Sequence, residues 1–207
     1  MRYRFTDGGD LENFGLISLL RRRVTKIVVF VNTLWPLSSC FDFQADWPDE
    51  SSPTSRVIDP FLAPLFGAPS ERFACNAVFP EADFCRLVTG LKDKKHAGES
   101  VMTTMRHTVQ DNEWWGLSGG WDVEICWVYN ERVAGWENQL PTGTREEIER
   151  GTGGTPRGPF KRFPHYLTQG QNVGALIRLT PEQINLLSHL SCWNVMANGD
   201  ELRSVLV

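Results

Sequence analysis

The sequence predicts an α/β protein, and three patterns carry this prediction. Residues 3–33 read as a short strand, a tight turn, a helix and a second strand, which is how a parallel-sheet unit is built. Residues 80–98 space their apolar side chains as a helix does, and residues 101–109 and 123–129 have the pattern of strands. We expect the functional site at strand ends, where open α/β sheets carry theirs.

The first strand, Tyr3–Asp7, ends in a turn that presents a carboxylate. Asp7-Gly8-Gly9 stands where the strand gives way to a helix, and glycine permits close backbone approach or a positive φ. Asp10 is the expected N-cap, with Glu12 and Asn13 in the first turn of the helix.

The helix and the strand after it look buried. Apolar residues of 11–20 point in nearly every direction around a helix, so we expect it to be covered on most of its surface. The run Lys26–Val31 then shows no alternation of apolar and polar residues. Such a run is typical of an interior parallel strand that is covered on both faces and has neighbours on both sides.

These residues resemble a known family. Asp7-Gly8-Gly9, then Leu11-Glu12-Asn13, Gly15-Leu16, Leu19-Leu20-Arg21 and Ile27-Val28-Val29 are similar to the last part of the catalytic domain of patatin-like and cytosolic phospholipase A2-like acyl hydrolases. The resemblance implies the terminal part of a patatin-like sheet. It makes Asp7 the aspartate of a Ser-Asp dyad, with Gly8 and Gly9 shaping the turn and Asn13 helping to order the loop.

The family also needs a nucleophilic serine on a strand-to-helix elbow, usually G-x-S-x-G, upstream of the aspartate. Only six residues precede Asp7, so we expect the C-terminal part of a longer hydrolase, or a degenerate relative, that is inactive alone. Gly116–Gly120 matches the elbow pattern around Ser118, but a β-patterned run follows it instead of a helix. Ser118 is therefore expected in a connection between two strands.

Two alternatives remain open. The chain could be a non-catalytic remnant of this fold that binds lipid or a protein partner. It could instead be a self-contained esterase that uses Ser118 and Asp7 with His107 or His165, provided that these groups converge in space. Taken singly, His107 is expected to be a hydrogen-bonded structural residue and His165 a loop anchor.

The predicted organisation has three parts. Residues 1–33 form the end of the catalytic domain, residues 34–79 an irregular connection rich in proline and aromatic residues, and residues 80–207 an α+β extension. The aromatic residues of the connection suit a packed loop better than a membrane-facing rim. Near the end, Thr180–Gln183 is a capping box that opens a helix with Ile184, Leu187 and Leu190 on its buried stripe.

Composition narrows the functional classes. The net charge of −4 does not suggest a nucleic-acid-binding protein, and no apolar run reaches the length of a membrane span. The five cysteines and four histidines lack metal-ligand spacing, so neither a metal nor a cofactor is expected. The expected partners are a lipid acyl-ester substrate, the upstream part of the hydrolase and a membrane surface, in a protein that is cytoplasmic or peripheral to a membrane.

Overall fold

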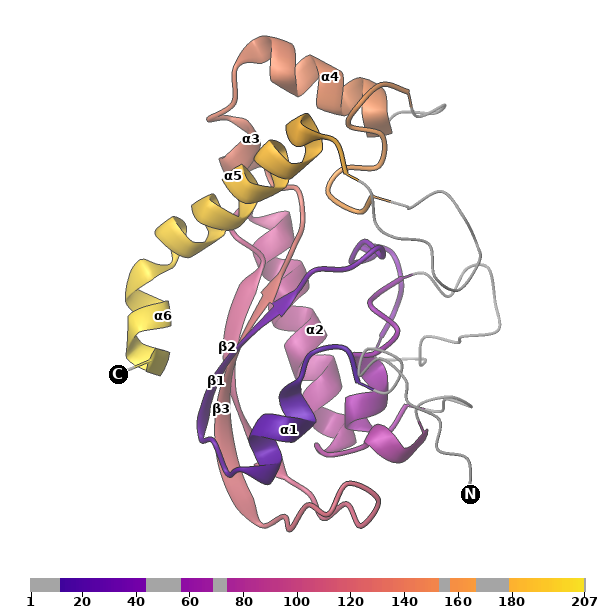
Figure 1. Ribbon diagram of the computed structural model, residues 1–207, viewed down its shortest axis with the longest axis vertical. Helices are drawn as coiled ribbons and strands as arrows, with labels where there is room; N and C mark the ends of the chain where they lie inside the picture. Colours follow the sequence, from indigo (N-terminus) through magenta and orange to yellow (C-terminus); the bar gives the residue numbers. More distant parts are fainter. Residues whose placement is uncertain (1–11, 44–56, 69–73, 153–156, 167–178, 207) are drawn as a thin grey trace.

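The computed structural model describes residues 12–43, 57–68, 74–152, 157–166 and 179–206 (Figure 1). In these ranges the chain is a mixed α/β structure, with helices packed on both faces of a three-stranded sheet. The predicted α/β class is confirmed at this level. The predicted first strand, Tyr3–Asp7, lies outside the described residues.

The first helix, α1, spans only Leu16–Arg21. The prediction that Glu12 and Asn13 belong to its first turn is wrong, because Gly15 adopts a left-handed conformation with φ 68° at the N-cap. Leu16, Ile17 and Leu20 are buried while Ser18 is exposed, so the helix is covered on one side and not on most of its surface.

Strand β1 spans Lys26–Val31 and pairs in parallel with β3, Trp121–Tyr129. The parallel prediction is correct. Among the described strands, whose order is β1-β3-β2, β1 has a neighbour on one side only. Burial alternates along it, and Phe30 remains 44% exposed. A continuous apolar run therefore overstated how much of the strand is covered.

A helix and two strands form the next part of the chain, as the sequence predicts. Helix α2, Glu81–His96, buries its predicted apolar face. Strand β2, Met102–Val109, then pairs antiparallel with β3 from Met102 opposite Val128 to Val109 opposite Trp121.

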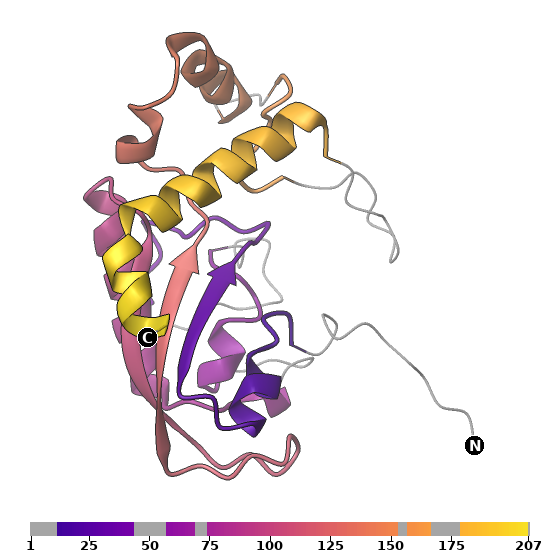
Figure 2. The ribbon, with the colours of Figure 1, turned by 60° about the vertical axis from the view of Figure 1, so that its left-hand side comes forward.

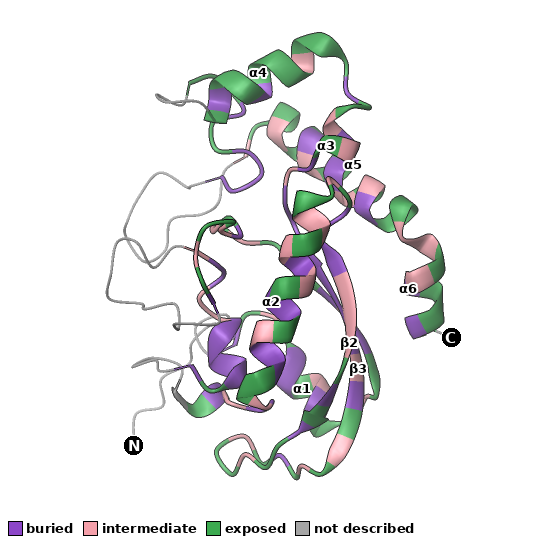
Figure 3. Ribbon diagram, turned by 180° about the vertical axis from the view of Figure 1, so that it is seen from behind, coloured by how far each residue is buried: buried purple, intermediate pink, exposed green. Residues whose placement is uncertain are grey.

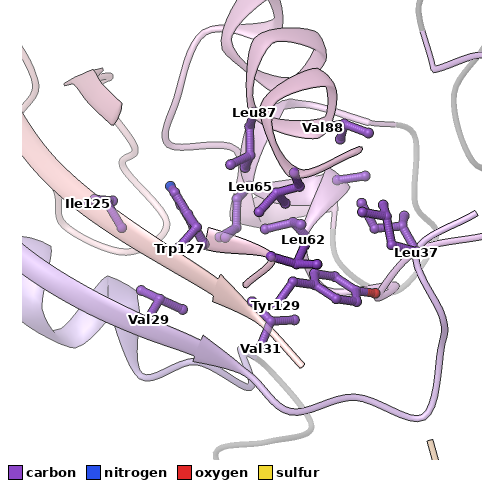
Figure 4. Packing of buried hydrophobic residues seen from close by; sticks show 14 of the residues in the cluster. Val29, Val31, Leu37, Leu62, Leu65, Leu87, Val88, Ile125, Trp127 and Tyr129 are labelled. Carbon is purple, nitrogen blue, oxygen red and sulfur yellow. The ribbon is translucent and has the colours of Figure 1, made fainter. Parts of the chain in front are cut away.

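The sheet is buried on both faces by different elements. On one face Val29, Val31 and alternate β3 residues share a core with α1, α2 and the segment around Leu62. Figure 4 shows the part of this core formed by the strands, α2 and the segment around Leu62. On the other face Val28, Cys126 and Val128 meet Leu202 and Val205 of α6, Gly199–Leu206. Side chains of successive strand residues point to opposite faces, so each face presents its own set of apolar residues. Figure 2 shows the two helices that cover them, α1 and α6, on opposite sides of the sheet.

The described parts of the connection, residues 34–43, 57–68 and 74–79, are irregular apart from two short 3₁₀ helices, η2 at Ala63–Phe66 and η3 at Ala74–Asn76. Phe43 and Phe66 are buried in the core, and Phe41 and Phe61 are half-buried. These aromatic residues form a packed loop, as expected, and not an exposed rim.

Helices α3, Ala134–Glu137, α4, Thr142–Thr152, and α5, Pro181–Ala197, gather beyond the carboxyl ends of β1 and β3 (Figure 1). Helix α4 is mostly exposed (Figure 3). The capping box of Thr180 and Gln183 opens α5 as predicted. Its buried residues are Leu186, Leu190 and Asn194. The expectation is confirmed for Leu190, Leu187 is partly buried against the core, and the expectation for Ile184 is wrong, because Ile184 is 50% exposed.

Candidate functional site

The residues of the predicted dyad turn, Asp7, Gly8 and Gly9, lie outside the described residues. Asn13 is described and is an exposed residue of the turn that leads into α1. Its neighbour Glu12 is buried and caps the helix, because its carboxylate oxygens accept hydrogen bonds from the backbone N–H groups of Phe14 at 2.6 Å and Ile17 at 3.3 Å. Glu12 thus fixes the chain between the predicted dyad turn and the sheet.

Burial dominates the electrostatics of Glu12. Removal from water raises the pKa of its carboxyl, although the hydrogen bonds from backbone N–H groups act in the opposite direction. This cap therefore binds its proton more readily than an exposed glutamate does.

Ser118 is exposed in the connection between β2 and β3, as the sequence predicts. Its carbonyl oxygen accepts a hydrogen bond from Trp121 Nε1 at 2.8 Å, and the element that follows Ser118 is strand β3, which begins at Trp121, and not a helix. Without that helix the segment lacks the geometry of a nucleophile elbow.

The structure does not bring Ser118 together with either candidate histidine. Ser118 lies at the amino end of β3, and His165 contacts Glu131, just beyond the carboxyl end of that strand. The nine residues of β3 span about 26 Å at roughly 3.3 Å per residue. His107 is fully buried and has other partners.

His107 belongs to a buried hydrogen-bonded chain, as expected of a structural histidine. Trp127 Nε1 donates to His107 Nε2 at 3.1 Å, so His107 Nδ1 carries the hydrogen that is donated to Asp83 Oδ2 at 2.8 Å. Desolvation lowers the pKa of His107 even though the Asp83 carboxylate acts to raise it. Arg86 binds the other oxygen of Asp83. The imidazole is thus held neutral between α2 and the sheet.

A second buried polar cluster lies where β1 and β3 end side by side. Glu131 follows β3 and is only 5% exposed. One carboxylate oxygen lies 3.0 Å from Lys95 Nζ, and the other accepts the backbone N–H of Leu37 and lies 3.3 Å from His165 Nε2. His165 Nδ1 donates to the carbonyl oxygen of Thr33 at 2.9 Å. His165 thus ties the loop after β1 to the residues after β3.

The charges in this cluster compensate one another. Burial acts to raise the pKa of Glu131, but His165, Lys95 and the Leu37 N–H outweigh burial and hold that pKa below its ordinary value. Glu131 is therefore a carboxylate at neutral pH, held by a buried network instead of by water.

Tyr129 and Asp59 continue the polar network on the η2 side. Tyr129 Oη donates to the carbonyl oxygen of Trp35 at 2.8 Å and accepts the N–H of Asp59 at 3.0 Å. Desolvation raises the pKa of the Asp59 carboxyl. The last residue of β3 therefore anchors both segments that close this edge of the sheet.

Two pockets open beside this cluster and share Leu34 and Pro164 in their walls. The first, of about 550 Å³, is lined by Thr33, Asn130 and Tyr166 and by apolar residues of α5. The buried Asn130 Oδ1 and the Tyr166 hydroxyl have no hydrogen-bond partner among the described residues. The second, of about 400 Å³, includes Glu131, His165 and two arginines, and we call it the arginine pocket.

The sequence pointed to strand ends in general but did not single out this cluster. Asn130-Glu131-Arg132 directly after a buried strand was the available signal, since polar residues at that position commonly line a site. Lys95 gave no comparable signal, because it belongs to a run of basic residues at the end of α2.

Among the described residues, no group of three or more His, Cys, Asp or Glu side chains could hold a metal ion. None of the described helices is long and apolar enough to cross a membrane. No family model, curated protein or solved structure matches this chain.

Proposed function

We propose that this chain takes part in the hydrolysis of lipid acyl esters, with Asp7 as the carboxylate of a Ser-Asp dyad and a serine other than Ser118 as the nucleophile. The observation that supports the proposal is the order of elements after the Asp-Gly-Gly motif in the sequence. Helix α1 leads into β1, and β1 runs parallel to β3. This is the helix and parallel strand that the patatin-like pattern of residues 7–31 implies.

The proposed chemistry needs few groups. In a dyad the aspartate accepts the serine proton during attack on the acyl carbonyl, and backbone N–H groups stabilise the oxyanion. Asp7 takes the role of general base, Gly8 and Gly9 shape its turn, and Asn13 orders the loop. The exposed position of Asn13 beside the Glu12 cap is compatible with a supporting role for that turn. The proposed location is the cytoplasm or the surface of a membrane.

The test compares two carboxylates of one segment in the protein expressed from its full native transcript. Asp7→Asn is expected to lower kcat/KM for a p-nitrophenyl acyl ester by about 10²–10⁴-fold, the usual contribution of a general base. The matched control Asp10→Asn is expected to stay within a few-fold of wild type. Equal activity of the two variants would reject the dyad role of Asp7.

A separate measurement addresses Ser118. The purified 207-residue chain is expected to leave lipid esters intact and to remain unlabelled by a fluorophosphonate probe. Turnover that Ser118→Ala abolishes would instead support the self-contained esterase.

The second candidate is a non-catalytic module that binds lipid or a protein partner. The two pockets at the strand ends favour it, because a binding module needs a site but no nucleophile. Full activity loss in Asp7→Asn argues against this candidate, whereas a native protein without esterase activity argues for it.

A further inference from the structure

The backbone of Arg162 adopts a conformation that L-residues rarely adopt. Its φ is 63°, and Arg23 is the other described residue besides glycine with a positive φ. Arg23 directly follows the C-cap of α1, where a left-handed residue is common. Arg162 instead lies in the loop that follows α4 and does not end a helix. A strained residue that persists beside a pocket is a reason to look for function.

Contacts to α4 hold this conformation. The N–H of Arg162 donates to the carbonyl oxygen of Gly151 at 2.9 Å, and the N–H of Phe163 donates to the carbonyl oxygen of Phe160 at 3.0 Å. Gly151 is buried, and a Cβ at that position would collide with the backbone of Phe160. The loop therefore lies directly on α4, and Arg162 is presented as part of the wall of the arginine pocket.

The charges of the arginine pocket leave one cation without a partner. Glu131 pairs with Lys95 at 3.0 Å, and Arg132 pairs with Glu137 at 2.6 Å and with Glu149 at 3.4 Å. No carboxylate of the described residues pairs with Arg162, whose side chain is exposed. Of the two arginines in the described part of the pocket, Arg162 is therefore the one without a carboxylate partner.

The remaining walls are largely apolar. Leu34, Trp35 and Pro36 follow β1 on one side, and Phe163 and Pro164 follow Arg162 on the other. A volume of about 400 Å³ is within the range of small-molecule sites. An arginine without a carboxylate partner in a pocket with largely apolar walls suits an amphiphile, a molecule with one anionic end and an apolar body.

We propose that the arginine pocket binds a carboxylate with an apolar body, such as a medium-chain monocarboxylate, through the guanidinium of Arg162. The planar fork of arginine matches the two oxygens of a carboxylate, and Trp35 and Phe163 cover the chain. This inference does not depend on the dyad, because Asp7 takes no part in it.

Sodium decanoate below its micellar concentration is the probe, and isothermal titration calorimetry gives the Kd. Arg162→Asn is the main variant, since asparagine tolerates a positive φ and the fold should be kept. We expect it to weaken decanoate binding at least about ten-fold, the loss of a charge-assisted hydrogen bond. Arg162→Lys keeps the charge but not the fork, and should fall between wild type and Arg162→Asn.

The matched control is Lys161→Gln, which removes a neighbouring exposed charge that does not line the pocket and should leave the Kd unchanged. We also expect 1-decanol and acetate to bind at least ten-fold more weakly than decanoate, because each lacks one of the two features. The proposal is overturned if wild type does not bind decanoate, if Arg162→Asn binds it as tightly as wild type, or if decanol or acetate matches it.

Discussion

Two buried tyrosines of this chain differ in what their hydroxyl groups do. The Tyr129 hydroxyl makes two hydrogen bonds to backbone groups, while the Tyr166 hydroxyl makes none. Desolvation raises the pKa of both phenols, so each stays protonated across the physiological range. A comparison of the two residues therefore separates the effect of burial on protein stability from the effect of hydrogen bonding.

We predict that Tyr129→Phe lowers the free energy of unfolding by about 1–3 kcal/mol, because it leaves the Trp35 carbonyl and the Asp59 N–H without their partner. The same change at Tyr166 removes a hydroxyl that has no partner and should be neutral or stabilise by up to about 1 kcal/mol. Urea unfolding of both variants measures the difference. A destabilisation of equal size at the two sites would contradict it.

Among the elements, α1 shows how local chemistry ends a helix. The N–H of Arg23 donates to Leu20 O at 2.9 Å and the N–H of Val24 donates to Leu19 O at 3.2 Å, which is the Schellman arrangement. Its left-handed residue is Arg23, with φ 56°, where glycine is usual. The helix therefore ends in a regular Schellman motif, although arginine is an unfavourable residue at the left-handed position of that motif.

We predict that Arg23→Gly stabilises the protein by about 0.5–1 kcal/mol, because glycine adopts a positive φ without steric cost. Arg22→Gly is the control. Arg22 has φ −88° and donates to Ser18 O, so glycine there should be neutral or destabilising. Thermal unfolding distinguishes the variants, and a lower Tm for Arg23→Gly than for wild type would refute the prediction.

Elements defined by local signals were predictable from the sequence. The capping box at Thr180 and the apolar spacing of α2 involve residues close in the chain, and both proved correct. The wrong predictions concern which parts of the molecule pack against a helix or strand. The apolar run of β1 does not show that the described sheet continues on one side of the strand only, and the apolar residues of α5 do not show which face of the helix meets the core.

The candidate site was less predictable for the same reason. Glu131 meets Lys95 and His165 only because α2, β3 and a distant loop converge at the end of the sheet. Each residue alone looks like an ordinary surface charge in the sequence. The position of the cluster could be expected from the ends of parallel strands, but its members could not.

At the scale of the whole molecule, one face of the sheet depends on the last helix. Leu202 and Val205 of α6 cover Cys126 and Val128, and this cluster is separate from the main core. Burial raises the pKa of the Cys126 thiol to about 11, whereas Cys40, Cys75 and Cys192 are exposed. The reactivity of Cys126 thus reports whether α6 is docked.

We predict that Val205→Asp exposes Cys126 to a thiol reagent such as DTNB, because a buried unpaired carboxylate displaces the helix. In the wild type, Cys126 should react only on unfolding. Leu206→Asp is the matched control, since Leu206 is 71% exposed and its replacement leaves the cluster covered. The role of α6 would be disproved by equal reaction kinetics of Cys126 in the two variants.

The contact between α4 and the loop that carries Arg162 sets a limit on sequence change. Most of α4 faces solvent, so substitutions along it should be tolerated freely, as on other exposed helices. Ile148 and Gly151 are the exceptions, because Ile148 is buried in the core and any side chain at position 151 would collide with Phe160. A mutational scan should therefore find two intolerant sites in an otherwise permissive helix, and only damage at Gly151 would spread to the arginine pocket through the loop that carries Arg162.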